Sequence, residues 1–148
     1  MGSTFVSLYF HVVFSTKNRA AQIKGELRSR LFAYVIGTAN KKNVEVIAIG
    51  GTEDHLHILL RANTETSISA IVRDLKSNSS RWVRSEFPTF RSFGWQDGYG
   101  AFTVSKSMME KVKQYVENQI QHHKKMSFQD ELRALLKNHG IEFDERYL

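Results

Sequence analysis

Two short apolar segments, residues 44–49 and 55–60, are separated by Gly50 and Gly51 and then by three polar residues. Each segment has the length of a strand, and paired glycines permit the tight backbone turn that joins neighbouring strands. The pattern predicts an antiparallel hairpin. A fold for this chain must therefore contain a sheet, and the other segments have to pack around this hairpin.

The segments on either side of the hairpin predict a layered α+β fold. Residues 5–15 and 101–105 are rich in the β-branched and aromatic side chains that favour strands. Apolar residues at helical spacing predict helices over residues 26–42 and 67–86, the second of them capped by Ser67. This order, βαββαβ, suits one antiparallel sheet with helices on one face.

Two more helices are expected after the last strand. Ser107 and Glu110 have the spacing of a capping box, which predicts a helix from Ser107 to about residue 125. Its core-facing stripe would consist of apolar residues four apart, namely Met108, Val112, Val116 and Ile120. A last, short helix should begin at Ser127. Because the sequence shows no repeat, low-complexity tract or linker, residues 1–148 are expected to form a single domain.

The composition, with 41% hydrophobic and 24% charged residues, is that of an ordinary globular protein. No cysteine occurs, which excludes disulfides, cysteine-bound zinc and thiol catalysis. No apolar run is long enough to span a membrane, and the N-terminus lacks a signal-peptide pattern, so we expect a cytoplasmic protein without a membrane partner. The net charge of +6 and the pI of about 9.7 favour a polyanionic partner, nucleic acid first, although charge alone also fits a basic protein with no such partner.

His55 and His57 lie two residues apart at the start of the second hairpin strand. Residues i and i+2 of a strand point to the same face, so the two imidazoles should be close enough to bind one divalent metal ion. The alternative is a pair of half-buried strand histidines. The pair indicates a metal site only if the chain also supplies a third ligand and a reactive group.

Tyr115 and Gln119 offer such a ligand and such a group. They are four residues apart in the predicted third helix, so they share a helix face, with Cβ atoms about 6 Å apart. Two imidazoles and an amide oxygen would leave open positions on Mg²⁺ or Mn²⁺ for substrate oxygens. A tyrosine hydroxyl beside the ion could attack a phosphodiester, forming a phosphotyrosine link and releasing a 3′-hydroxyl. Alternatively, Tyr115 packs at the edge of the apolar stripe and Gln119 is solvated.

Four segments of the chain, in this order, resemble the single-tyrosine HUH transposases of the smallest insertion sequences, which move as single-stranded DNA. The segments are residues 9–19 (YFHVVFSTKNR), 50–57 (GGTEDHLH), 93–102 (FGWQDGYGAF) and 115–119 (YVENQ), the last followed by His122 and His123. HUH denotes two histidines around a large apolar residue, here Leu56. The segments extend over most of the chain.

The resemblance implies that His55, His57 and Gln119 are the metal ligands and that Tyr115 is the nucleophile. It also implies an RRM-like or ferredoxin-like sheet and a homodimer in which each tyrosine helix docks into the partner subunit's histidine site. The partner would be single-stranded DNA with hairpins near the element ends, in a prokaryotic cytoplasm. Three alternatives stay open: a domesticated relative that processes repeated palindromes, a non-catalytic nucleic-acid-binding module, and a hydrolase that uses water.

Several other residues are candidates for contacts in or near such a site. The candidates for phosphate contacts are Lys17, Arg19, Arg73, Lys76 and Arg81, although a solvated basic face also explains them. His11 is interpreted as an ordinary sheet residue in preference to a supporting group of the metal site. His122 and His123 fit either contacts to phosphate or metal, or a basic helix end. Trp95 and Tyr99 are candidates for base stacking, and Trp95 fits the core equally well.

Overall fold

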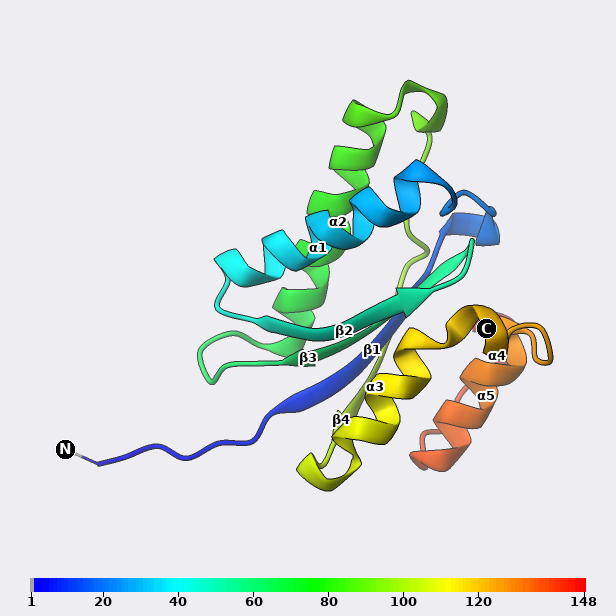
Figure 1. The fold of residues 1–148 in the computed structure, drawn as a ribbon. Coiled ribbons are helices and arrows are strands. Elements are labelled where there is room, and N and C mark those ends of the chain that lie inside the picture. Colours follow the sequence, from blue (N-terminus) through cyan, green and yellow to red (C-terminus); the bar gives the residue numbers. More distant parts are fainter. Residues whose placement is uncertain (1) are drawn as a thin grey trace.

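The computed structural model describes residues 2–148 and shows a four-stranded antiparallel sheet in the order β2-β3-β1-β4 (Figure 1). The strands are β1 (Tyr9–Ser15), β2 (Glu45–Gly51), β3 (His55–Arg61) and β4 (Gly100–Val104). The helices are α1 (Glu26–Lys41), α2 (Ile68–Glu86), α3 (Met109–Glu117), α4 (Gln119–His122) and α5 (Phe128–Asn138). The predicted hairpin is β2–β3, and the predicted βαββαβ order with additional C-terminal helices is confirmed.

Helices cover both faces of the sheet (Figure 1). The first two, α1 and α2, pack on one face around a core that includes Leu60 of β3. The C-terminal helices lie on the opposite face, where Leu59 packs in a second cluster with Val116 of α3. Because alternate strand residues share a face, Leu59 points the same way as His57 and His55. The strand period therefore places both histidines beneath the C-terminal helices.

Gly50 allows α3 to lie directly against β2. A Cβ atom at this position would overlap the main-chain carbonyl oxygen of Val116, which cannot move without moving the helix. Gly50 lies inside β2, ahead of the turn, so this position requires glycine because of the packing against α3. Since α3 carries Tyr115, the close approach at Gly50 also fixes the height of this tyrosine above the sheet.

We expect Gly50→Ala to lower the free energy of unfolding by about 1–3 kcal/mol, because the added methyl group pushes α3 away from the sheet. The matched control is Gly37→Ala in α1, where a Cβ atom would meet nothing within 4 Å. There alanine should raise stability by roughly 0.5–1 kcal/mol through its higher helix propensity. Thermal unfolding followed by circular dichroism checks both. Equal effects of the two substitutions would contradict the packing argument.

The predicted third helix is wrong in its details. The segment starts with a 3₁₀ turn, Lys106–Met108, and the helix breaks at Asn118 (φ −102°, ψ 27°) between α3 and α4. Ser107 does not cap α3, and its hydroxyl lies 3.1 Å from that of Ser105. Of the predicted apolar stripe, Val112 and Val116 do pack in the core, but Met108 and Ile120 at its two ends are 44% and 53% exposed, and Met109 is buried in place of Met108.

Other boundaries agree with the sequence more closely. The hydroxyls of Ser67 and Ser127 cap α2 and α5, each accepting a hydrogen bond from a backbone N–H at 3.2 Å. The first strand is shorter than predicted: it starts at Tyr9, and the apolar side chains of Phe5 and Val6 before it are exposed. Within residues 2–148, none of the helices combines the length and the apolar character needed to cross a membrane.

Candidate functional site

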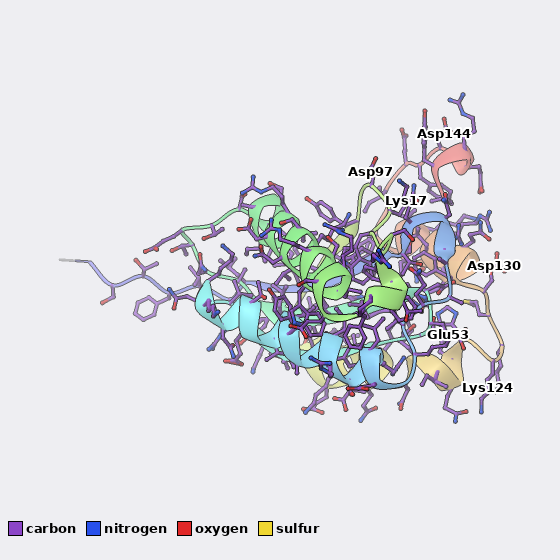
Figure 2. All side chains as sticks on the ribbon, turned by 90° about the horizontal axis from the view of Figure 1, so that it is seen from above. Lys17, Glu53, Asp97, Lys124, Asp130 and Asp144 are labelled. Atoms are coloured by element: carbon purple, nitrogen blue, oxygen red, sulfur yellow. The ribbon has the colours of Figure 1, made fainter. Side chains whose placement is uncertain are left out.

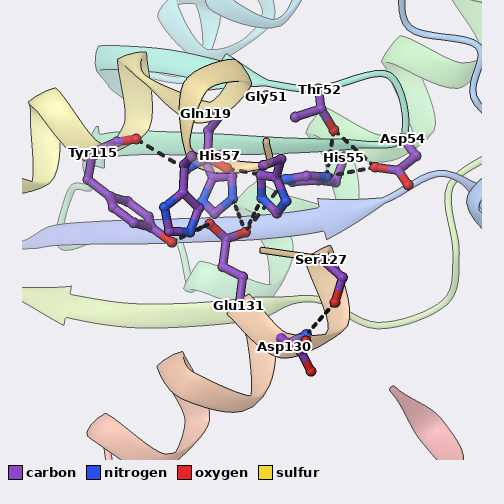
Figure 3. Close-up of polar contacts among 12 residues, drawn as sticks. Gly51, Thr52, Asp54, His55, His57, Tyr115, Gln119, Ser127, Asp130 and Glu131 are labelled. Atoms are coloured by element: carbon purple, nitrogen blue, oxygen red, sulfur yellow. Dashed lines mark hydrogen bonds and ion pairs between the residues drawn. The ribbon is translucent and has the colours of Figure 1, made fainter. Parts of the chain in front are cut away.

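His55 and His57 lie side by side on β3, fully buried, with their ring centroids 5.1 Å apart (Figure 3). The Nδ1 atom of His55 is 2.8 Å from Asp54 Oδ1 and 3.0 Å from the hydroxyl of Thr52. The Nδ1 atom of His57 is 2.7 Å from Nε2 of His11. With both Nδ1 atoms engaged, both Nε2 atoms face the space under the C-terminal helices, as in metal sites where the second ring nitrogen is hydrogen-bonded.

His11 is therefore a supporting group of the site, and its interpretation as an ordinary sheet residue is wrong. It lies on β1, next to β3 in the sheet, and is 4% exposed. A lone histidine in the sequence gave no reason to expect this contact. It arises because β1 and β3 are paired, although His11 and His57 are 46 residues apart in the chain.

Tyr115 and Gln119 reach the same space from the helices above (Figure 3). The Tyr115 ring packs edge-on against His57, with centroids 5.7 Å apart. The side chain of Gln119 is buried, and its Nε2 donates to the main-chain oxygen of Tyr115 at 3.1 Å. This bond turns the amide oxygen of Gln119 toward Nε2 of His55, 3.3 Å away. The structure thus brings the four predicted residues together within one chain.

Glu131 of α5 is the residue that sequence reasoning missed. Its side chain is 1% exposed, and its carboxylate lies between Tyr115 and the histidines (Figure 3). One oxygen, Oε1, is 2.9 Å from Nε2 of His57 and 3.0 Å from Nε2 of His123, and the other accepts a hydrogen bond from the hydroxyl of Tyr115. The sequence did contain one indication of a buried role for this residue: it is a glutamate on the apolar face of a capped helix, four residues before Leu135.

The surroundings of these groups set their charges. Burial lowers the pKa of His57 to about 4, against the opposing effect of its hydrogen bond with Glu131. Burial raises the pKa of Tyr115 well above its usual range, and the bond to Glu131 adds to the shift. Burial would raise the pKa of Glu131, but the hydrogen bonds from His57 and Tyr115 outweigh it and hold that pKa well below its usual range. At neutral pH the site therefore contains an uncharged His57, a carboxylate and a protonated phenol.

The donor set fits a divalent cation. His55, His57, His123 and Glu131 each offer one ligand atom, and these atoms lie within 4.8 Å of one another. Nitrogen and carboxylate donors in this combination suit Mn²⁺ and similar ions, and the Gln119 oxygen adds a further donor. Among the described residues, the buried Nε2 of His122 has no hydrogen-bond partner, although it lies 3.3 Å from Glu131.

A cavity of about 410 Å³ opens beside this site. His123 belongs both to the donor set and to the lining of the cavity, so the cavity adjoins the site at this residue, whereas His55 and His57 themselves are buried. The basic side chains of Lys24, Arg28 and Lys124 line it together with the acidic Glu53. Figure 2 shows Glu53, Lys124 and Lys17 at the same end of the molecule, opposite the N-terminal segment.

The predicted phosphate-contacting residues fall into two groups. Arg19 lies near the site, because its guanidinium is 5.4 Å from the ring of Phe128, which in turn stacks on His55. Lys17 is exposed in the same turn. Arg73, Lys76 and Arg81 are on α2, which covers the opposite face of the sheet (Figure 1). The structure therefore does not bring the α2 group to the histidines.

Within the α2 group, Lys76 has a structural contact of its own. Its ammonium donates to the main-chain oxygens of Gln96 and Gly98, at 2.7 Å each, and so holds the loop before β4. Trp95 is 9% exposed and donates to the hydroxyl of Ser79 at 2.9 Å, which confirms the core alternative for this residue. Tyr99 is 42% exposed and stays a candidate for base stacking.

This fold, with a histidine pair beneath a helix that carries a tyrosine, is that of a class of DNA transposases. A crystal structure from Deinococcus radiodurans, assigned as a transposase, matches with a TM-score of 0.66 at 28% identity over 80% of this chain and 96% of that chain. A REP-associated tyrosine transposase bound to a REP hairpin shares the fold, with a TM-score of 0.58 at 13% identity over 78% of this chain and 68% of that chain.

Residues 4–119 match the family described as "Transposase IS200 like", and the chain belongs to this family. The ISDra2 transposase TnpA of Deinococcus radiodurans is 28% identical over 117 residues, covering 76% of this chain and 84% of that protein. The transposase for insertion sequence element IS200 of Salmonella typhimurium is 29% identical over 121 residues, which is 78% of each. The family match ends at residue 119, so α5 and Glu131 lie beyond it.

Proposed function

We propose that this transposase cuts and rejoins single-stranded DNA through a covalent bond between Tyr115 and a 5′-phosphate. The observation that carries the proposal is the convergence of this tyrosine with the buried histidine pair: the rings of Tyr115 and His57 lie 5.7 Å apart, and a cavity lined in part by His123 adjoins the site. A phenol oxygen beside a cation-binding cluster is suited to attack on phosphorus. We assign the cation to His55, His57 and Gln119, as in the neutral ligand set expected from the sequence.

In the proposed reaction, the Tyr115 oxygen gives up its proton to solvent and forms a bond to phosphorus. The bond between phosphorus and the 3′-oxygen of the preceding nucleotide breaks, and this oxygen takes up a proton to become a free 3′-hydroxyl. A bound Mg²⁺ or Mn²⁺ would supply Lewis-acid polarisation of the phosphate and stabilise the leaving oxygen. Rejoining is the reverse attack by a 3′-hydroxyl, and it needs no ATP because the phosphotyrosine bond conserves the energy of the broken one.

The chain's own residues prepare this reaction before DNA binds. His11 orients His57, while Asp54 and Thr52 orient His55, so neither imidazole has to rotate to present its Nε2 atom. The bond from Gln119 to the Tyr115 main chain links the proposed amide ligand to the nucleophile's own helix. Such preorganisation lowers the reorganisation cost in the transition state.

We further propose hairpin-bearing single-stranded DNA as the partner. The net charge of +6 favours a polyanion, and a transposase of the same fold has been solved with a REP hairpin. The relatives from ISDra2 and IS200 favour a mobile element over a domesticated enzyme. Imperfect palindromes in the DNA on both sides of the gene would support the mobile element, and solitary scattered palindromes the domesticated role.

The proposal predicts that wild-type protein incubated with labelled hairpin DNA and Mn²⁺ leaves a covalent adduct that survives SDS gel electrophoresis. EDTA added before the DNA should prevent formation of the adduct, and adding Mn²⁺ in excess of the EDTA should restore its formation. A non-catalytic binding module would instead bind the DNA equally with or without EDTA and leave the strand intact. A hydrolase that uses water would give cut DNA with free ends and no protein-bound product.

A further inference from the structure

Glu131 is a buried charge that the proposed reaction does not use. Carboxylates are rarely as buried as this side chain, which is 1% exposed, unless they are paired or bind a metal ion. It lies on α5, twelve residues beyond the end of the family match at residue 119. Its position in the centre of the site therefore calls for a role that the proposed ligand set of two histidines and a glutamine does not provide.

The two oxygens of Glu131 face two different parts of the site. Oε1 faces imidazole nitrogens only: Nε2 of His57 at 2.9 Å, Nε2 of His123 at 3.0 Å and Nε2 of His55 at 3.6 Å. Oε2 accepts the hydrogen bond from the hydroxyl of Tyr115. One carboxylate thus connects the proposed ligand nitrogens to the proposed nucleophile.

We propose that Glu131 is a ligand of the divalent ion through Oε1 and a positioning residue for Tyr115 through Oε2. The second half of this assignment rests on the proposed function. Two imidazoles and an amide leave both positive charges of the ion uncompensated, whereas one carboxylate neutralises half of them and suits Mg²⁺ and Mn²⁺ better than imidazole does. The site would then hold its ion before DNA arrives, with the tyrosine already tied to one of the ligands.

The packing of α5 fixes this carboxylate in place. At the start of the helix the ring of Phe128 stacks on His55, with centroids 4.3 Å apart. Just after its end His139 stacks on Phe102 of β4 at 4.6 Å. Aromatic contacts at both ends hold the helix against the sheet, so Glu131 enters the site from a rigid element.

The test is a titration of Mn²⁺ into the full chain without DNA, following the electron paramagnetic resonance signal of the free ion. Glu131→Gln keeps the side-chain volume but removes the charge, and we expect it to bind Mn²⁺ about tenfold more weakly or worse. The matched control is Asp130→Asn, the same change on the neighbouring exposed residue, which should stay within about twofold of wild type. Circular dichroism verifies that each variant is folded.

Binding by Glu131→Gln that equals or exceeds the wild-type affinity would overturn the assignment as a ligand. An increase would mean that the carboxylate blocks the site instead of completing it. Adduct formation at saturating Mn²⁺ tests the positioning role: Glu131→Ala should be slower than Glu131→Gln, whose amide oxygen still accepts from Tyr115. If both variants form the adduct at the wild-type rate, the positioning role is overturned. If the wild type itself forms no adduct, only the proposed function is contradicted.

Discussion

Replacing Tyr115 by phenylalanine is expected to reduce formation of the covalent DNA adduct by about a thousandfold or more, to below detection. The phenyl ring can keep its edge-on contacts with His57 and His11, at 5.7 and 5.8 Å between centroids, but the nucleophilic oxygen is gone. Loss of the hydrogen bond to the buried Glu131 carboxylate should cost about 1.5–3 kcal/mol of stability, which is too little to unfold a domain of ordinary stability. Denaturing gels of labelled hairpin DNA with Mn²⁺ measure the adduct.

The control for this substitution is Tyr147→Phe, which removes a hydroxyl from a side chain that is 81% exposed. It should form the adduct at the wild-type rate. Mass spectrometry of the digested wild-type adduct should place the nucleotide on the peptide containing Tyr115. An adduct of normal yield in Tyr115→Phe would show that another residue is the nucleophile.

His57→Ala is expected to lower adduct formation by about a hundredfold or more, because it removes a proposed ligand of the ion. It also leaves a cavity and takes a partner from both His11 and Glu131, so the free energy of unfolding should fall by about 2–4 kcal/mol. His57→Leu fills more of the cavity without offering a ligand atom, and so separates the loss of the ligand from loss of the fold. Retained Mn²⁺ affinity in a folded His57→Leu would contradict the assignment of this ligand.

Tyr115→Phe and His57→Ala together test whether active sites are shared between subunits. In the structure, Tyr115 lies beside the histidines of its own chain, and a site built from two subunits remains a prediction. If sites are shared in a homodimer, mixing Tyr115→Phe with His57→Ala subunits should restore about a quarter of the wild-type sites at random exchange. If the mixture stays inactive while subunits demonstrably exchange, each site is built within one chain.

The parts of this protein that follow from local chemistry could be predicted from its sequence. The alternation along β3 put His55 and His57 on one face, and Ser67 and Ser127 were recognisable as helix caps. The four-residue spacing brought Tyr115 and Gln119 together even though the helix breaks between them at Asn118. In each case the deciding interactions join residues only a few positions apart.

The parts that depend on tertiary contacts could not be predicted in this way. The bond between Glu131 and His57 joins residues 74 positions apart, and helical periodicity defines the apolar face of α5 without saying where that face docks. The two ends of the predicted apolar stripe were wrong for a related reason. The turn at Met108 and the break at Asn118 take Met108 and Ile120 out of the regular helix, and neither has a strong sequence signal.

Helices cover both faces of the sheet, and this limits where unpaired bases could bind. A four-stranded sheet with one open face can stack unpaired bases on its aromatic side chains. Here α1 and α2 occupy one face and α3 to α5 the other (Figure 1), so within the described chain no such platform is offered. If the protein acts on hairpin-bearing single-stranded DNA as proposed, the scissile phosphate has to reach the histidines under α3 to α5, without an open sheet face to hold the flanking bases. We therefore expect any stacking of unpaired bases to use exposed aromatic side chains outside the sheet faces, of which Tyr99 is a candidate.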